Sequence, residues 1–329
     1  MYSAPLAGHI NLFAPQTYQT YQRTNGTGSI AVSGTFNQSG AHDVEARFNG
    51  GAWVTLASGV ISGALFSGTL TGQGAGQGDL DVRLVDVPAV TATIENVGIG
   101  DVFGIIGQSN AMGYGINNQV YAGPPSATCF GNDYDWRGLV DPVDRNTLQV
   151  DAVSDDTIAA GSVWPLLATS IMAATGYPVA FVPCPKGGSS ITQWQPGANH
   201  FDRSTLYGSV AYRLSVTGCK AILMWQGESD LAMARAQYNA YLDTVANSFY
   251  SDLGILLMPC KLQDCTAVDE SNVNDAIGDA WADNPNVLTG PDLHGITTAP
   301  EDNYHLRTDA KLLSAANLWW AAIQAEFGW

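Results

Sequence analysis

The sequence has little positive charge. Lys and Arg together number 13 in 329 residues, against 30 Asp and Glu, and the formal net charge is −17. Only four of the 13 are lysines, and the 13 form no run along the chain. Nucleic-acid binding and docking on anionic membranes both depend on clustered Lys and Arg. We therefore expect neither a nucleic acid nor a membrane surface as a partner.

Long apolar runs are also missing. No stretch approaches the roughly 18 uninterrupted apolar residues of a membrane helix. The opening segment, MYSAPLAGHINLFAPQ, carries neither the basic segment nor the apolar core of a secretory signal. With no such signal visible, we still expect an extracellular, periplasmic or virion-associated location.

The five cysteines show no metal or redox pattern, because no two of them have the two-residue spacing of such sites. Cys184 and Cys219 lie in or beside apolar runs, which is typical of small buried thiols. Cys260 and Cys265 are close enough to close a small disulfide loop. No metal or other cofactor is predicted.

Apolar and aromatic residues, by contrast, are plentiful. Hydrophobic residues make up 46% of the chain and aromatic residues 10%, enough to fill a large core. The 36 glycines and nine tryptophans suggest turn-rich β structure and an uncharged ligand. The length of 329 residues fits either two domains or one large α/β domain.

Residues 28 to 97 alternate apolar and polar side chains with a period of two. Turn signals, Asn49-Gly50-Gly51 and the segment TGQGAGQGD, separate the alternating runs. Short half-buried strands of this kind are typical of an antiparallel sandwich or barrel. We predict a β-sandwich-like accessory domain over residues 1–98. The apolar positions of its strands are Ile30, Val32, Phe36, Val44, Ala46, Phe48, Leu80, Val82 and Leu84.

The pattern changes after Gly100 to continuous apolar runs separated by amphipathic stretches of helical length. Uninterrupted apolar strands are typical of a parallel sheet covered on both faces, and alternating strands and helices build right-handed crossovers. We predict a doubly wound α/β domain over residues 99–329. The expected strands are 102–106, 179–182, 221–225, 255–258 and 287–288, and the expected helices are 162–175, 204–216, 231–250, 271–282 and 307–327.

Polar, glycine-rich segments follow several of these apolar runs. They are GQSN at 107–110, KGGSS at 186–190 and QGESD at 226–230, and a loop after the fifth run reaches DNYH at 302–305. Ligands of an open parallel sheet bind outside the carboxyl ends of its strands. The sequence therefore predicts the active site at these segments.

Ser109 is the candidate nucleophile. It follows a strand through Gly107 and would open the next helix, whose free N–H groups favour an oxyanion. Because Ser is also a common helix N-cap, its position alone does not decide between the two roles. A serine nucleophile needs a general base. The five histidines, His9, His42, His200, His294 and His305, supply the candidates.

His305 is the favoured base. It lies three residues after Asp302 and just before the last predicted helix, so both side chains can project from one loop. A carboxylate at this spacing can orient the imidazole and stabilise its protonated form. His294, two residues after Asp292, is the alternative base, and its other interpretation is a solvated loop histidine.

Acyl transfer also needs donors for the developing oxyanion. Gly187 and Gly188 can bring backbone N–H groups close, with a tight turn as the alternative interpretation. Gln226 carries a side-chain amide at the end of a neighbouring strand, and its alternative role is to cap a helix or bridge the core. Glu228 is either a charge at a helix N-terminus or a carboxylate that orders the site.

Together these blocks resemble a known family. The strand-GQSN block, the KGGSSITQW block, the WQGESD block at 225–230 and the DNYH block are similar to those of the SGNH hydrolases, in the sialate O-acetylesterase and acetylxylan-esterase branch. They occur in the expected order, each after the expected strand, over about residues 101–327. The resemblance implies that residues 99–329 form a flavodoxin-like, five-stranded parallel sheet with helices on both faces.

The resemblance also implies the roles of the site residues. Ser109 would be the nucleophile, His305 the base and Asp302 its orienting acid. The oxyanion hole would combine the Ser109 amide, a glycine amide, preferably that of Gly188, and the Gln226 side chain, where the broader superfamily has Asn. No metal is implied. The supporting residues are Gln108, Gly187 and Glu228.

Two regions fall outside this resemblance or match it weakly. The segment from about 113 to 161 is an insertion that the core pattern does not need, and a loop this long is usually functional or disordered. We expect it to shape the substrate cleft. Trp136, Trp194 and Tyr114 could stack on a sugar, with burial in the core as the alternative. The segment QRTNGTGSIAVSGTF resembles the opening strands of small β-domains attached to some members.

The predicted function is metal-independent O-deacetylation of an acetylated sugar or polysaccharide through an acyl-enzyme. One alternative keeps the esterase but changes its substrate, to a short-chain carboxylester or a surface polysaccharide. The other is a glycan-binding or structural protein with a vestigial triad. The sequence makes no prediction of oligomeric state.

Overall fold

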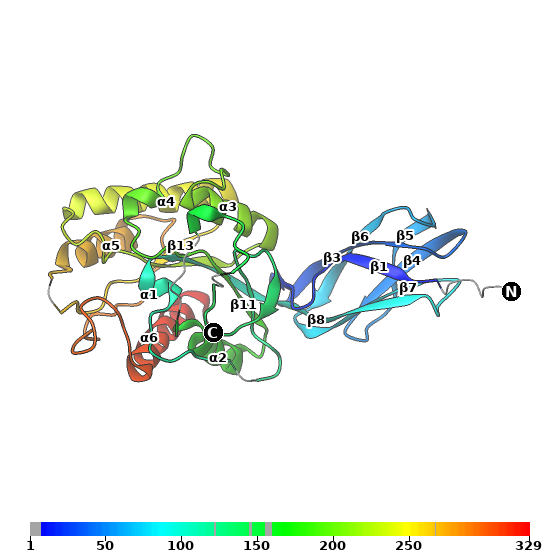
Figure 1. Cartoon of the computed structure of the whole chain (residues 1–329), viewed down its shortest axis with the longest axis horizontal. Helices are drawn as coiled ribbons and strands as arrows, with labels where there is room; N and C mark the ends of the chain where they lie inside the picture. The colour runs from blue at the N-terminus through cyan, green and yellow to red at the C-terminus, as the bar shows by residue number, and fades with distance from the viewer. Residues whose placement is uncertain (1–7, 122, 145–146, 155–159, 267) are drawn as a thin grey trace. The chain divides into compact units, whose positions relative to one another are not determined.

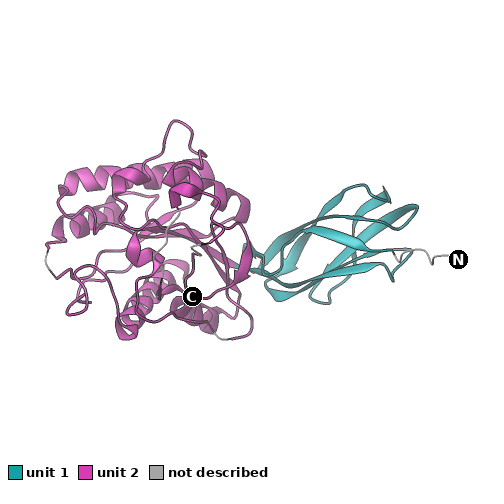
Figure 2. Ribbon diagram, in the orientation of Figure 1, with its two compact units in different colours: residues 1–100 teal, residues 101–329 magenta. Residues whose placement is uncertain are grey.

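The computed structural model describes residues 8–121, 123–144, 147–154, 160–266 and 268–329. The chain forms two compact units, residues 1–100 and 101–329, which Figure 2 shows in different colours. Strand β8 (Thr91–Gly107) carries the chain from the first unit into the second. No helix in the described ranges is long and apolar enough to cross a membrane.

The first unit is built from two groups of strands (Figure 1). One is an antiparallel sheet in the order β1-β3-β6, with β1 at Ile10–Ala14, β3 at Thr27–Phe36 and β6 at Phe66–Gly74. The other places β5 (Val54–Ile61), β4 (Ala41–Phe48), β7 (Gly76–Leu84) and the first part of β8 side by side and antiparallel. Strand β2 (Thr20–Gln22) lies parallel to β8.

The core of this unit contains the apolar positions that alternate in the sequence. Because side chains of a strand point to opposite faces in turn, every second residue enters the interior. All nine predicted positions are buried, at 5% exposure or less, which confirms the alternation: Ile30, Val32, Phe36, Val44, Ala46, Phe48, Leu80, Val82 and Leu84.

In the second unit, the end of β8 lies between two parallel strands, β11 (Val179–Pro183) and β12 (Ala221–Trp225). Strand β13 (Leu257–Pro259) pairs with β12, and β9 (Thr128–Phe130) pairs with β11, both also parallel. Strand β10 (Trp136–Gly138) is antiparallel to β9. Through β8, these strands belong to a mixed sheet of ten strands.

This sheet differs from the predicted set of five parallel strands. Four of the predicted apolar runs correspond to β8, β11, β12 and β13, but the fifth is reduced to an isolated parallel bridge between Val287 and Leu257. Two apolar residues are too few to extend a ladder, and the N–H of Val287 is taken by a turn to Asn284. The insertion adds β9 and β10, which the sequence did not predict.

The helices flank the sheet of the second unit. Figure 1 shows α3, α4 and α5 on one side of it and α2 and α6 on the other. All five lie where helices are predicted: α2 at Trp164–Thr175, α3 at Leu206–Thr217, α4 at Arg235–Leu253, α5 at Ser271–Asp283 and α6 at Asp309–Phe327. A four-residue helix, α1 (Ser109–Met112), and two 3₁₀ turns, η1 (Ala152–Ser154) and η2 (Ile191–Trp194), complete the unit.

None of the five cysteines forms a disulfide. The disulfide that the sequence allows between Cys260 and Cys265 is therefore not formed, and both side chains are buried. Cys184 is buried, as expected, whereas Cys219 is half-buried and its sulfur accepts the N–H of Gly104 (3.1 Å).

Candidate active site

A pocket of about 390 Å³ opens where β8, β11 and β12 end. Its walls come from the loops that follow these three strands and from the loop before α6, so segments distant in the sequence meet at one edge of the sheet, as predicted from the general rule for open α/β sheets. The lining residues are Gln108, Ser109, Met112, Tyr114, Gly187, Gly188, Glu228, Ser229, Tyr304 and His305.

Gly107 sets the sharp turn that places Ser109 in the pocket. Its φ of +125° is a conformation that residues with a side chain rarely adopt. A Cβ at this position would lie 1.9 Å from the carbonyl oxygen of Trp225, the same oxygen that accepts the N–H of Gln108 (3.0 Å). Helix α1 then begins at Ser109, whose N–H has no partner within the helix.

Ser109 and His305 are in hydrogen-bond contact, with 2.8 Å between the Ser109 Oγ and the His305 Nε2. On the other side of the ring, Nδ1 lies 3.0 Å from the Oδ1 of Asp302. The angle of this second contact does not meet that of a hydrogen bond, so the buried Nδ1 has no hydrogen-bond partner. Catalytic hydrogen bonds are often poorly aligned before substrate binds. The structure thus brings these three predicted residues together.

Asp302 is held as a carboxylate. Burial raises its pKa, but the N–H groups of Tyr304 and His305 and the nearby imidazole together hold the pKa of Asp302 below its ordinary value. Its Oδ1 accepts the Tyr304 N–H at 2.9 Å and the His305 N–H at 3.2 Å. The ring of Tyr114 stacks on the imidazole at 4.1 Å between centroids and fixes the plane of the ring.

Two amide side chains hold the loop that carries His305. Asn110 donates its Nδ2 to the carbonyl oxygen of Tyr304 (2.9 Å) and accepts the N–H of Leu306 at its Oδ1 (3.1 Å). Gln263 donates its Nε2 to the same Tyr304 oxygen (2.7 Å). No role was predicted for either residue from the sequence. The position of Asn110 directly after Ser109 was a signal for it, whereas nothing in the sequence marked Gln263.

Glu228 anchors both amides. Its Oε1 accepts from Asn110 Nδ2 at 2.6 Å and from Gln263 Nε2 at 3.0 Å, while its Oε2 is buried without a partner. Burial raises the pKa of Glu228, and the two amide donors oppose that rise. Glu228 therefore orders the site through Asn110 and Gln263, which corresponds to the second of the two roles considered for it.

The two predicted glycines line the pocket. Gly188 has a φ of +68° and lies at the surface of the pocket, with open space where a Cβ would be. Its N–H donates to no residue in the described part of the chain. The turn that holds it is closed by a bond from the Ser189 N–H to the Lys186 carbonyl oxygen (3.2 Å).

Gln226 does not reach the pocket. Its side chain is only 1% exposed and is absent from the lining. Its Nε2 faces three acceptors, the Ser189 carbonyl oxygen (2.7 Å), the Asp230 Oδ2 (3.0 Å) and the Gln108 Oε1 (3.1 Å). Because an amide has only two hydrogens to donate, none is left for a substrate. This placement matches the core-bridging alternative considered for Gln226, not the predicted oxyanion donor.

The aromatic residues also differ in part from the prediction. Trp136 and Trp194 are buried, at 8% and 0% exposure, and the Trp194 Nε1 donates to Ser189 Oγ (3.0 Å). Neither can stack on a sugar. Within the described part of the insertion, Tyr114 alone lines the pocket, so the hairpin of β9 and β10 extends the sheet and does not shape the cleft.

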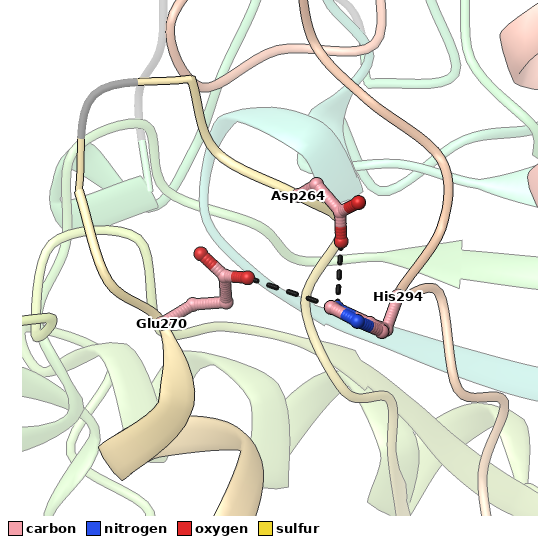
Figure 3. Close-up of side chains that lie close together, drawn as sticks. All are labelled: Asp264, Glu270 and His294. Atoms are coloured by element: carbon pink, nitrogen blue, oxygen red, sulfur yellow. Dashed lines mark ion pairs between the residues drawn. The ribbon is translucent and has the colours of Figure 1, made fainter.

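His294, the alternative base, lies in a separate cluster. Its Nδ1 is 2.6 Å from Asp264 Oδ1 and 3.8 Å from Glu270 Oε1, and Figure 3 shows one ion pair from the imidazole to each carboxylate. These three residues could hold a divalent cation, since one ligand atom from each lies within 4.8 Å of the others. His294 itself is 68% exposed, and none of the three lines the pocket.

A known protein family matches most of the chain. The sequence model described as "Carbohydrate esterase, sialic acid-specific acetylesterase" matches residues 99–324. No curated protein sequence matches the chain.

Two solved structures share its fold. One is a carbohydrate acetylesterase from Xanthomonas citri, with a TM-score of 0.64 and 16% identity, over 97% of this chain and 76% of that one. The other is a protein from Arabidopsis thaliana, with a TM-score of 0.53 and 20% identity, over 69% of this chain and 99% of that one.

Proposed function

This chain belongs to the sialic acid-specific acetylesterase family of carbohydrate esterases. We propose that it removes acetyl groups from an acetylated sugar or polysaccharide by way of an acyl-enzyme. The observation that carries the proposal is the 2.8 Å contact between Ser109 Oγ and His305 Nε2 inside the pocket. A nucleophile and base at this distance are the requirement for serine catalysis. We also propose that the flavodoxin-like core of the family is formed here by β11, β8, β12 and β13, extended by the Val287 bridge.

In the first half of the reaction, the Ser109 Oγ attacks the acetyl carbonyl carbon while His305 Nε2 accepts the hydroxyl proton. The carbonyl π electrons move to oxygen, giving a tetrahedral oxyanion. When the oxyanion collapses, the bond to the sugar oxygen breaks and that oxygen takes the proton from His305. The sugar leaves as an alcohol, and the acetyl group remains on Ser109.

In the second half, His305 takes a proton from water, and the hydroxide formed attacks the acetyl carbon. Collapse of the second oxyanion breaks the bond to Ser109 Oγ, which recovers its proton from His305. Acetate is released. Asp302 stabilises the protonated imidazole in both halves, and its lowered pKa keeps it ionised for this role.

The oxyanion in this proposal is stabilised by backbone N–H groups. The Ser109 N–H lies at the first position of α1 and the Gly188 N–H lies at the pocket surface, and both are free to donate. Donors fixed in advance need no reorganisation when the charge develops, and each is typically worth about 10²–10³ in rate.

The experiment that tests the proposal is a measurement of acetate release from acetylated xylan, O-acetylated sialic acids and acetylated bacterial polysaccharides, by the wild type and Ser109→Ala. We expect at least one acetylated carbohydrate to be deacetylated by the wild type and not by the variant. Binding of these glycans without any acetate release would contradict the proposal and favour a glycan-binding protein.

The same assay with acetyl, butyryl and octanoyl esters separates a deacetylase from a general carboxylesterase. A deacetylase should hydrolyse the acetyl ester and turn over the octanoyl ester far more slowly. Comparable rates on all three esters would favour the short-chain carboxylesterase alternative.

A further inference from the structure

The imidazole of His305 is not held in its plane by Asp302. Its buried Nδ1 lies 3.0 Å from the Asp302 Oδ1 but has no hydrogen-bond partner. Its Nε2 is 2.8 Å from the Ser109 Oγ, and this contact fixes one atom of the ring. The outer side-chain torsion of a histidine is broad, so one contact at the tip leaves the ring free to turn. The plane of the ring therefore depends on packing.

Tyr114 and Arg307 supply this packing. The Tyr114 ring stacks on the imidazole of His305, with 4.1 Å between the centroids and 18° between the planes. The Arg307 Cζ lies over the same tyrosine ring, 5.5 Å from its centroid. Because the imidazole covers one face of that ring, the guanidinium takes the other. The three side chains form a stack in the order His305, Tyr114, Arg307.

The guanidinium of Arg307 is committed to this stack. Arg307 is half-buried, and in the part of the chain that the structure describes its side chain forms no ion pair and no hydrogen bond. A guanidinium over a tyrosine ring is attracted by the negative face of the ring. With no carboxylate to draw it away, the guanidinium stays on Tyr114.

Backbone and side-chain bonds join the two segments that carry Tyr114 and Arg307. The N–H of Ile116 donates to the carbonyl oxygen of Arg307 (2.7 Å). The Nε2 of Gln119 donates to Asp309 Oδ1 (3.0 Å). The start of the insertion is thus attached to the segment between the base and α6, and the stack is built on two segments that are bonded to each other.

We infer that Arg307 is a positioning residue of the active site, which holds Tyr114 against the imidazole and so keeps the His305 Nε2 directed at Ser109. This inference rests on the proposed function. Arg307 does not line the pocket, so it acts on the base through Tyr114 and not on the substrate. The start of the insertion thereby contributes to holding the base.

Arg307→Ala is the first variant, with p-nitrophenyl acetate as substrate because it has an acetyl carbonyl and no sugar hydroxyl. We expect kcat to fall about three- to tenfold while KM changes less than about twofold. Tyr114→Leu, which removes the ring, should lose about 10–10² in kcat. Tyr114→Phe keeps the ring and should recover most of that loss.

The double variant Arg307→Ala/Tyr114→Leu is decisive. Residues that act through one another show non-additive effects. Because Arg307 acts through Tyr114, the double variant should match Tyr114→Leu alone within about twofold in kcat. Losses that multiply would overturn the inference, since Arg307 would then act on the site by another route.

The matched control is Arg83→Ala in the first unit. Arg83 is a half-buried arginine whose Cζ lies over the Trp53 ring, 3.9 Å from its centroid, and it pairs with Glu45. Its removal should leave kcat unchanged, and a loss equal to that of Arg307→Ala would overturn the inference. If Arg307→Ala fails to fold, as judged by thermal unfolding, Arg307→Gln replaces it with the same expected result.

Wild-type turnover of p-nitrophenyl acetate that is lost in Ser109→Ala is established first, because its absence would contradict the proposed function itself. Given an active wild type, a normal kcat for Arg307→Ala overturns the inference alone. A rise in KM with kcat unchanged also overturns it, because Arg307 would then bind the substrate and not position the base.

Discussion

The side chain of Asn110 donates a 2.9 Å hydrogen bond to the carbonyl oxygen of Tyr304, which joins the residue after Ser109 to the residue before His305. The same side chain accepts the N–H of Leu306 at 3.1 Å. Both chain neighbours of His305 are thus held by one amide. This connection links the backbone next to Ser109 to the backbone on both sides of His305.

Asn110→Ala should therefore lower kcat without a comparable rise in KM. With the amide gone, the Tyr304 carbonyl oxygen keeps only the Gln263 bond and the Leu306 N–H loses its acceptor. A displacement of about 1 Å in a catalytic group can cost on the order of 10² in rate. Steady-state kinetics on p-nitrophenyl acetate measure the effect.

Asn132→Ala is the control for the loss of a buried asparagine. Asn132 is also buried, and its side chain makes three hydrogen bonds, to the Asp151 carbonyl oxygen (3.0 Å), Ser154 Oγ (3.1 Å) and the Asp151 N–H (2.8 Å), but it does not line the pocket. Both variants should lose stability, and only Asn110→Ala should lose kcat. Equal kcat losses would show that Asn110 has no special connection to His305.

Asp302→Asn should reduce kcat by roughly 10²–10⁴, because an amide neither stabilises the protonated imidazole nor selects its tautomer. The wild-type carboxylate has a lowered pKa, so it is already ionised at about pH 5 and the loss should be similar at about pH 5 and pH 8. Kinetics at the two pH values provide the measurement.

The matched control is Asp292→Asn. Asp292 lies beside the alternative base His294, and its nearest cation is Lys261 at 3.7 Å. We expect full activity. A large loss of kcat in Asp292→Asn, together with an active Asp302→Asn, would show that His294 and not His305 is the base.

Gly107→Ala should destabilise the protein by at least about 2 kcal/mol, because alanine adds both the strain of a positive φ and a clash with the Trp225 carbonyl oxygen. Gly138→Ala, in β10, is the control, since nothing lies within 4 Å of its Cβ position. Urea unfolding compares the two. Equal urea midpoints for the two variants would show that the turn before Ser109 can adjust to accommodate alanine at position 107.

The buried carboxyl of Asp144 should make the protein less stable as pH rises. Burial raises the pKa of Asp144 from an ordinary value of 3.8 to about 6. The folded state therefore binds this proton more tightly than the unfolded state. The resulting stabilisation is fully present below pH 3.8 and is lost as the pH rises through about 6.

Asp144→Asn cannot ionise, so its stability should decline less over this range. Urea unfolding at about pH 4.5 and pH 7.5 measures the difference between the variant and the wild type. The comparison is needed because burial also raises the pKa of Asp141 to about 6, which adds a decline of the same sign to both proteins. Parallel pH dependence in the two proteins would contradict the shift at Asp144.

Much of the fold could be predicted because its elements are long and strongly patterned. The alternation from Ile30 to Leu84 follows from strands with one buried face, and the five long helices lie where amphipathic stretches occur. The edge of the sheet could not be predicted. Strands β9 and β10 are three residues each, too short for a periodic signal, and the Val287 run is too short to become a strand.

The site residues could be predicted where the order of the sequence blocks along the chain determines their position. Ser109, Gly188 and His305 each follow a strand or precede a helix, so topology brings them to one edge of the sheet. The orientation of amide side chains is a different matter. Whether Gln108 or Gln226 opens to the pocket depends on the acceptors around each, and Gln263 reaches Tyr304 only through tertiary packing.

The most direct test of the central claim is to identify the residue that carries the acetyl group during turnover. The wild type is mixed with p-nitrophenyl acetate, quenched in acid within one turnover, digested and mapped by mass spectrometry. The account predicts a single acetyl group on the peptide containing Ser109, absent from Ser109→Ala. An acetyl group on another residue, or turnover by Ser109→Ala at the wild-type rate, would contradict it.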